Sequence, residues 1–501
     1  MKDKLDQLRE ILGEIKDLSY ASAILSWDEQ VNMPAKGSRE RGEQLATLGR
    51  IAHTKFTSDG VGELLEELEP YAKTLDPDSN EARLIKQTRR DYDIQARVPS
   101  EYVSREARAT SAAHQSWVMA RQASDFSLFQ DNLQNIIELK REYSSYFAPS
   151  EHPYDPLLDQ YEPGLKTLEV KEIFDSLRPR QVELIKAIAA APQVDSSFLY
   201  LDYPEKDQWN FGVAVISDFG YEWDRGRQDY SPHPFSTSFG LDDVRITTRV
   251  YNDFFNSGLF STLHECGHAL YELGIDPALA RTPLADGTSL GVHESQSRMW
   301  ENLVGRSLPF WDHYYPKLVE VFPSQLGNVS KESFYKAVNK VEPSMIRVEA
   351  DEATYNLHIM LRLGIEIALI EGSLDVADLP EAWDQGMEDY LGIRPADQAE
   401  GVLQDVHWSM GLLGYFSTYA LGNLISAQLW ERIREDIPNL DDQIRRGDFG
   451  ELLGWNREKI HRHGAKFEPQ ELIERVTGSR INPDPYVRYL AEKYSTIYGL
   501  G

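Results

Sequence analysis

The sequence predicts a mainly α-helical protein with one small β-sheet near the middle of the chain. Apolar residues recur at three- and four-residue spacings over most of the 501 residues, whereas strand-like alternation is scarce. No internal repeat, low-complexity tract or obvious linker interrupts the chain. Hydrophobic residues make up 41% of the composition, enough to bury a large core in several domains or in one two-lobed body.

Helical periodicity begins at the N-terminus, where residues 5–18 place leucine and isoleucine on one stripe. The same spacing predicts further helices over residues 38–53, 129–147, 168–191 and 354–372, and again after Ala420. The best strand pattern covers residues 243–250, while residues 208–220 fit a helix or a strand. Segments rich in Gly, Pro, Asp and Ser predict loops at residues 224–236 and 281–295.

The net charge of -29 argues against nucleic acid and anionic membranes as partners, because both attract basic surfaces. Cys266 is the single cysteine, so no intrachain disulfide can form, which is typical of a reducing compartment. The charged N-terminal segment lacks the apolar core of a signal peptide, and no apolar run is long enough to span a bilayer. We therefore expect a cytoplasmic protein.

The stretch STLHECGHALYELG, residues 261–274, carries the most specific chemical signal. On a helix, His264 and His268 lie one turn apart and can bind one ion, and Glu265 can reach a water on that ion. This H-E-x-x-H arrangement is typical of zinc hydrolases, in which the glutamate is the general base. The alternative is a surface helix with two polar histidines.

Apolar residues around this motif favour the helical reading. They form a core stripe made of Leu259, Leu263, Cys266, Leu270 and Leu273. Gly274 is a reasonable end for the helix, and Gly267 keeps the space beside the ligand face free of bulk. Because Cys266 lies on the stripe, we expect it to pack in the core rather than to bind metal.

A zinc hydrolase needs a third protein ligand, and residues 291–306 offer candidates on a predicted helix that Gly305 could end. Glu294 and Glu301 both lie there, and His293 is a rival. A glutamate completes the His₂Glu set and is preferred on that ground. Without further support, a solvated face explains any single glutamate here better than metal binding does.

Ordered stretches along nearly the whole chain resemble the Taq-type metallocarboxypeptidases, the thermostable carboxypeptidase family. The H-E-x-x-H motif followed by HESQ matches that family. The other matching stretches are residues 25–48, SPHPFS (231–236), DVRITT (243–248), IRVEADE (346–352) and GVLQDVHWSMGLLGYFSTYALGN (401–423).

The resemblance implies a large helical saddle-like body with a deep active-site cleft and a small antiparallel β-sheet beside it, similar to neurolysin and angiotensin-converting enzyme. It implies one catalytic domain over residues 1–501, with two lobes flanking the cleft and helices of about residues 1–60 as a cover. It also implies a homodimer that releases single amino acids from peptides with a free C-terminus, with broad specificity. His264, His268 and Glu294 take the ligand roles for zinc, although cobalt or manganese would also suit them.

Further site residues follow from the resemblance and from what the reaction requires. His407 and Tyr415 are candidates for stabilising the oxyanion, by analogy with other helical zinc peptidases, although Tyr415 fits core packing equally well. A carboxypeptidase must also hold the substrate carboxylate, for which arginine is suited. We favour Arg347 over Arg245 for this contact; the alternative for each is a structural ion pair, with Asp351 or Asp243.

Two more residues are candidates with weaker support. His233, in a loop that could reach the cleft, is a substrate-side group or a loop-stabilising one. Asp405 could orient a nearby histidine. The competing functions are a zinc oligopeptidase or dipeptidase, which would share the metal site without the carboxylate clamp, and an inactive peptide-binding protein.

Overall fold

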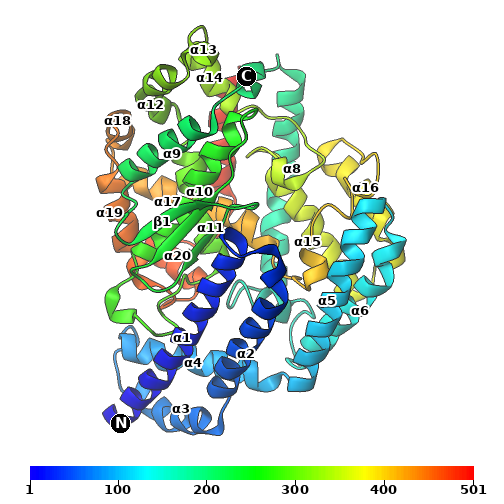
Figure 1. The fold of residues 1–501 in the computed structure, drawn as a ribbon, viewed down its shortest axis with the longest axis vertical. Coiled ribbons are helices and arrows are strands. Elements are labelled where there is room, and N and C mark those ends of the chain that lie inside the picture. Colours follow the sequence, from blue (N-terminus) through cyan, green and yellow to red (C-terminus); the bar gives the residue numbers. More distant parts are fainter. Residues whose placement is uncertain (501) are drawn as a thin grey trace.

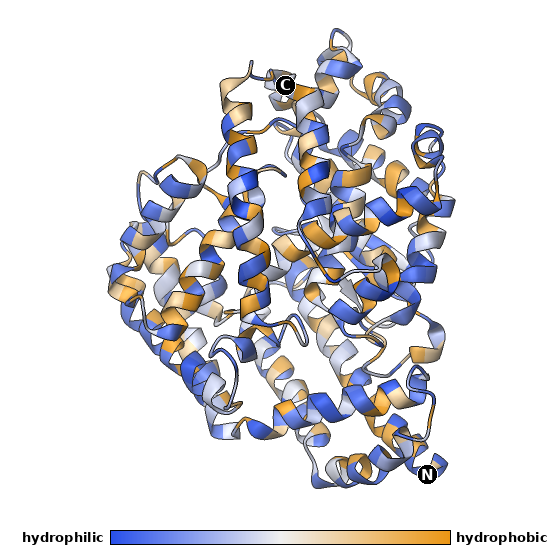
Figure 2. Cartoon of the chain, turned by 180° about the vertical axis from the view of Figure 1, so that it is seen from behind, coloured by the Kyte–Doolittle hydropathy of each residue, from blue (hydrophilic) through white to orange (hydrophobic). Residues whose placement is uncertain are grey.

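Helices form most of the protein in the computed structural model, which describes residues 1–500 (Figure 1). One three-stranded sheet lies near the centre. The mainly helical fold predicted from the sequence is therefore confirmed. Figure 2 shows hydrophilic and hydrophobic residues interspersed along the long helices. No helix among residues 1–500 combines the length and apolar character that a membrane crossing requires.

The first four helices pack as a unit with an apolar core of its own. They are α1 (Lys2–Val31), α2 (Ser38–Phe56), α3 (Asp59–Ala72) and α4 (Asn80–Arg97). Leu5, Leu8 and Leu12 of the predicted stripe are buried in this core, and Ile275 and Leu284 from a later loop complete it. Because α3 and α4 share this core with α1 and α2, the N-terminal unit extends over residues 2–97.

The main core is built by the remaining helices. Those on the right of Figure 1 are α5 (Ser100–Ala123), α6 (Ser127–Ser145), α8 (Thr167–Ala190), α15 (Tyr355–Glu371) and α16 (Leu379–Leu391). Those around the sheet and at the upper left are α9 (Glu205–Phe219), α12 (Leu308–Val321), α13 (Pro323–Leu326), α14 (Lys331–Val338), α18 (Leu440–Arg445) and α19 (Gly450–Lys459). The others are α7 (Asp155–Leu158), α17 (Ser417–Asp436), α20 (Pro469–Thr477) and α21 (Asp484–Tyr498).

The sheet is mixed rather than antiparallel. Its strands are β1 (Gly226–Tyr230), β2 (Ser236–Ser238) and β3 (Val244–Thr248), in the order β1-β3-β2. β1 runs parallel to the central β3, while β2 returns antiparallel along the other edge of β3. The predicted strand is confirmed as β3, but β1 lies in a segment predicted to be a loop. Its sequence, GRQDY, lacks the apolar alternation that marks a strand.

The H-E-x-x-H motif lies on α10 (Phe255–Leu273), which packs against β3. The predicted stripe of this helix, Cys266 included, is buried, and the helix ends at Gly274 as expected. α11 (Leu290–Arg298) follows and continues into a π-helical turn, η4 (Met299–Val304), which ends at Gly305. α11 packs between α10 and α17, an arrangement that brings two segments of distant sequence to one place.

Candidate metal centre

α10 and α11 bring His264, His268 and Glu294 together. Ligand atoms of the three residues all lie within 4.8 Å of one another. Glu294 Oε2 is 3.6 Å from His264 Nε2 and 3.5 Å from His268 Nε2. A tetrahedral ion with bonds of about 2.0–2.1 Å separates its ligand atoms by roughly 3.4 Å. The three predicted ligands therefore fit a single zinc-sized ion.

Two glycines allow α11 to approach its neighbours closely enough for this geometry. A Cβ at Gly267 on α10 would lie 2.6 Å from Ser297 Cα and 2.7 Å from the Gln296 carbonyl oxygen. A Cβ at Gly422 on α17 would lie 2.5 Å from Glu294 Cγ. Neither position has room for a side chain, so the backbone of α11 and the stem of Glu294 rest directly on two neighbouring helices.

The substitution Gly267→Ala is expected to weaken metal binding at least tenfold, because the added methyl group meets rigid backbone and must push α11 away from the histidines. Competition with a chromophoric chelator would measure the affinity. Gly454→Ala is the matched control, since a Cβ at Gly454 on α19 meets nothing within 4 Å. Equal metal affinity in both variants would contradict this account of the helix contact.

A buried carboxylate orients His264. Its Nδ1 lies 2.9 Å from Glu301 Oε2 on the π-helical turn. Arg298 links this residue to the centre, because Nη1 donates to Glu301 at 3.1 Å and Nε donates to Glu294 at 2.7 Å. Burial opposes ionisation of Glu301, but Arg298 and His264 outweigh it and lower its pKa to about 2. Glu301 therefore accepts from His264 Nδ1–H, which leaves Nε2 free to bind an ion.

A second chain of hydrogen bonds orients His268. Its Nδ1 lies 2.7 Å from Nδ1 of His293, whose Nε2 lies 2.7 Å from Glu272 Oε1. The Glu272 carboxyl oxygen accepts a hydrogen bond from His293 Nε2–H, so His293 Nδ1 accepts a hydrogen bond from His268 Nδ1–H and His268 Nε2 stays free. The rival ligand His293 thus lies behind His268. Glu272 was not predicted, although it follows His268 by four residues on the same helix.

Glu265 is a buried carboxyl group beside the two histidines, with 7% of its surface exposed. Burial raises its pKa to about 7, and the nearby charges of Glu294 and Glu301 add to this, while His264 acts in the opposite direction. A carboxyl group with a pKa near neutrality is suited to accept and return a proton at neutral pH.

Arg347 is buried, and Tyr355 connects it to Arg298. Its Nε and Nη2 donate to Asp405 at 3.1 and 2.9 Å, and its Nη1 donates to the Tyr355 hydroxyl at 2.8 Å. The ring of Tyr355 in turn stacks on Arg298, with 4.6 Å between guanidinium and ring centre. The ion-pair partner of Arg347 is thus Asp405, 58 residues away, and not Asp351.

Asp405 holds two guanidinium groups, since Arg362 also donates to it. It additionally lies 3.9 Å from Nδ1 of His407, the histidine it could orient. His407 packs on Tyr415, with ring centres 5.5 Å apart. Burial lowers the pKa of His407 to about 4 and raises the pKa of Tyr415. Both side chains are therefore neutral hydrogen-bond donors at neutral pH.

Arg245 on β3 forms the predicted pair with Asp243, through two hydrogen bonds of 2.8 Å. Its guanidinium also lies between two aromatic rings, 4.5 Å from Trp27 of α1 and 4.8 Å from Phe239. The N-terminal helix therefore covers this arginine. The His233 imidazole is exposed between β1 and β2, and no hydrogen bond links it to another side chain among residues 1–500.

Comparisons with known proteins agree over nearly the full chain. Residues 7–494 match the sequence model of the Carboxypeptidase Taq (M32) metallopeptidase family. Thermostable carboxypeptidase 1 of Thermus thermophilus is 43% identical, with 98% of each chain covered, and carboxypeptidase 1 of Bacillus subtilis is 39% identical, with 98% of this chain and 97% of that protein covered.

Solved structures give the same answer. The M32 carboxypeptidase from Deinococcus radiodurans superposes with a TM-score of 0.97 at 40% identity, covering 99% of this chain and 100% of that one. Pyrococcus furiosus carboxypeptidase superposes with a TM-score of 0.94 at 38% identity and covers 99% of both chains. With the family match and the converging histidines and glutamate, this chain belongs to the M32 family of Taq-type metallocarboxypeptidases.

Proposed function

We propose that this metallocarboxypeptidase uses a zinc ion held by His264, His268 and Glu294 to release single C-terminal amino acids from peptides, with broad specificity. The convergence of three ligand atoms at tetrahedral spacing carries the proposal. The ion would lower the pKa of its bound water and polarise the scissile carbonyl. Cobalt and manganese suit the same ligands.

Glu265 takes the proton of the attacking water and returns it to the leaving amine. Its burial supports this role, because a pKa near neutrality balances proton uptake and release. His407 and Tyr415 donate hydrogen bonds to the oxyanion as it forms. Their neutral, adjacent rings support this pairing.

Arg347 binds the substrate carboxylate in this proposal, with Arg245 as the second candidate. Arg347 is preferred for two reasons. First, it is connected to Glu294 through Tyr355 and Arg298. Second, its hydrogen bonds to Asp405 and Tyr355 use three of its five N–H groups, which leaves two for a substrate carboxylate. Arg245 packs under Trp27 of α1. If the N-terminal helices cover the cleft, Arg245 lies on the inner face of that cover, where it can meet the substrate. His233 is a substrate-side group at the rim.

The wider assignment is one catalytic domain over residues 1–501, with two lobes and the N-terminal helices as a cover over the cleft. We place the enzyme in the cytoplasm as a homodimer without nucleic-acid or membrane partners. The single buried thiol and the net charge of -29 support the compartment and the excluded partners. The homodimer rests on the family resemblance.

Mass spectrometry of a peptide with a blocked N-terminus tests the activity. We expect a ladder that shortens one residue at a time from the C-terminus, disappears with chelator and returns with Zn²⁺ or Co²⁺. The same peptide with an amidated C-terminus should resist cleavage, since it lacks the carboxylate that arginine binds. Internal cuts would favour an oligopeptidase. Intact peptide with every divalent metal would favour a peptide-binding protein.

A further inference from the structure

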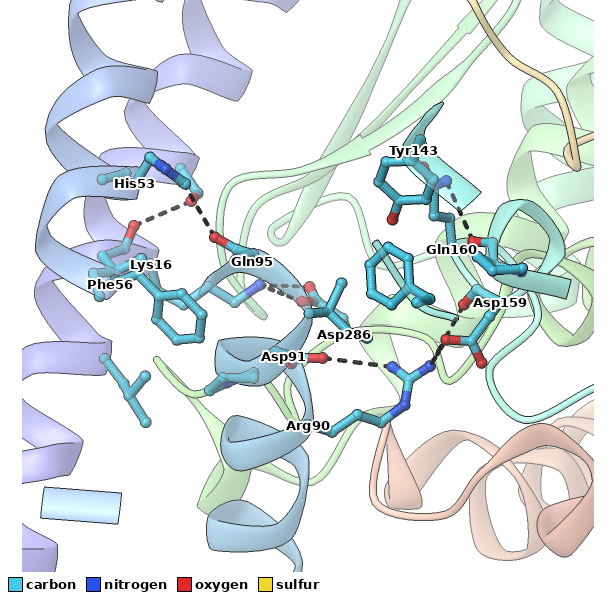
Figure 3. Close-up of a pocket in the computed structure, with 18 residues that line it drawn as sticks. Lys16, His53, Phe56, Arg90, Asp91, Gln95, Tyr143, Asp159, Gln160 and Asp286 are labelled. Atoms are coloured by element: carbon cyan, nitrogen blue, oxygen red, sulfur yellow. Dashed lines mark hydrogen bonds and ion pairs between the residues drawn. The ribbon is translucent and has the colours of Figure 1, made fainter. Parts of the chain in front are cut away.

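A cavity of about 630 Å³ lies between the N-terminal helices and the rest of the protein (Figure 3). Residues of α1, α2, α4 and α6 line it, together with segments 156–160 and 283–286. Ser19 and His53 are exposed and give it access to solvent. The volume is in the range of sites that bind small molecules or a few peptide residues.

Two connections place this cavity beside the metal centre. Gln160 lines it, and the next residue, Tyr161, packs edge-on against Tyr415 with ring centres 5.3 Å apart. On the other side, Asp286 lines it, and desolvation by the surrounding protein together with the charge of Glu272 raises the pKa of Asp286, although its side chain is 53% exposed. Since Glu272 is the carboxylate at the end of the His268 hydrogen-bond chain, the cavity and the centre share a wall.

The charges in the cavity are unevenly compensated. Lys16 Nζ pairs with Asp286 Oδ2 at 2.5 Å, and Arg90 Nη2 pairs with Asp159 Oδ2 at 2.6 Å. Asp91 accepts from the Gln87 amide at 3.0 Å and forms a longer ion pair of 3.6 Å with Arg90, which it shares with Asp159. Figure 3 shows Asp91 beside Arg90, with a dashed line for the ion pair between them and another from Arg90 to Asp159.

The lining therefore sets three carboxylates against two cations, and of the two carboxylates that share Arg90, Asp91 has the longer contact. Burial raises its pKa to about 6, which reflects this weak compensation. A cationic group brought next to Asp91 would gain a charge-assisted hydrogen bond in a partly desolvated site. Apolar or aromatic side chains make up much of the remaining wall, namely Leu12, Ile15, Phe56, Ile94, Tyr143 and Phe147, while Ser19, His53, Gln95 and Gln160 add polar groups. The matching ligand carries a positive charge on an apolar stem.

We propose that this cavity binds an alkylammonium group of the peptide substrate, upstream of the scissile bond, with Asp91 as its counter-ion. The group is either the amino terminus of a short peptide or a lysine side chain of a longer one. This inference rests on the proposed function, because it assumes that the peptide bond to be cleaved lies at the metal centre.

Two matched peptide series test the proposal. The first compares free with acetylated amino termini over lengths of three to eight residues, and the second compares lysine with Nε-acetyl-lysine at successive upstream positions. We expect kcat/KM to favour the charged form at least tenfold at one or two positions. In Asp91→Asn this preference should fall to near one. Asp93→Asn is the control, because Asp93 lies on the same helix but pairs with Arg89 outside the cavity.

A preference in the first series alone identifies the amino terminus, and a preference in the second alone identifies lysine; either supports the proposal. Equal rates for charged and acetylated peptides at every position overturn it, as does a preference that survives Asp91→Asn. Calorimetry with the Glu265→Gln holoenzyme measures the binding affinity of the same peptides in the absence of turnover. If no peptide is cleaved but acetylation still weakens binding, the proposed function fails while the cavity assignment stands. Equal affinities for the charged and acetylated peptides overturn the cavity assignment.

Discussion

Replacing Glu265 with glutamine is expected to lower kcat by about a thousandfold while the metal stays bound. Glutamine has nearly the same shape but cannot accept the proton of the attacking water. None of the three ligand atoms belongs to Glu265, so the metal affinity should change little. Steady-state kinetics on a tripeptide, together with elemental analysis of the purified variant, would measure both quantities.

Glu458→Gln serves as the control for this substitution, since Glu458 pairs with the exposed Arg462 at the surface. Its kcat should match that of the unmodified enzyme. Full turnover by metal-loaded Glu265→Gln would remove Glu265 from the mechanism. Loss of metal from Glu265→Gln would show instead that the residue supports the site structurally.

The substitution Asp405→Asn is expected to lower the free energy of unfolding by about 3 kcal/mol at neutral pH. The side chains of Arg347 and Arg362 are 5% and 1% exposed, and the Asp405 carboxylate is their shared counter-ion. Its removal leaves two like charges buried side by side without compensation. Asp17→Asn, which breaks an exposed pair with Arg281, should leave stability nearly unchanged.

The effect of Asp405→Asn should depend on pH. Burial opposes ionisation of Asp405, but the two arginines outweigh it and hold its pKa well below the usual value. A carboxylate with a depressed pKa stabilises the folded state above its unfolded pKa of about 3.9, and this contribution is lost as pH falls through the folded pKa. Denaturant unfolding should therefore show a full difference between variant and wild type at neutral pH and a shrinking one in acid. A difference that is constant with pH would contradict the charge argument.

Local patterns were sufficient to predict the helix of the metal site. The apolar stripe, the two histidines and the terminal Gly274 all lie within one stretch of α10, so their spacing alone determines which side chains share a face. The strand β1 was missed because its residues are polar, and its place in the sheet depends on β3, which is 18 residues further along the chain. Pairings over long distances leave no local signal.

The candidates for the third ligand show the same limit. From the residues alone, Glu294, Glu301 and His293 were all open. The fold separates them, because Glu294 faces both histidines while the π-helical turn carries Glu301 behind His264. The pairing of Arg347 with Asp405 was equally out of reach, since 58 residues separate the two.

The burial of the only thiol has a practical consequence. Burial raises the pKa of the Cys266 thiol, which keeps it protonated and unreactive while α10 remains packed. A thiol-reactive dye therefore has no native target on the folded enzyme. A cysteine introduced at any exposed position can therefore be labelled selectively. The slow rate at which Cys266 itself is labelled would measure how often α10, the helix that carries the histidines, separates from the core.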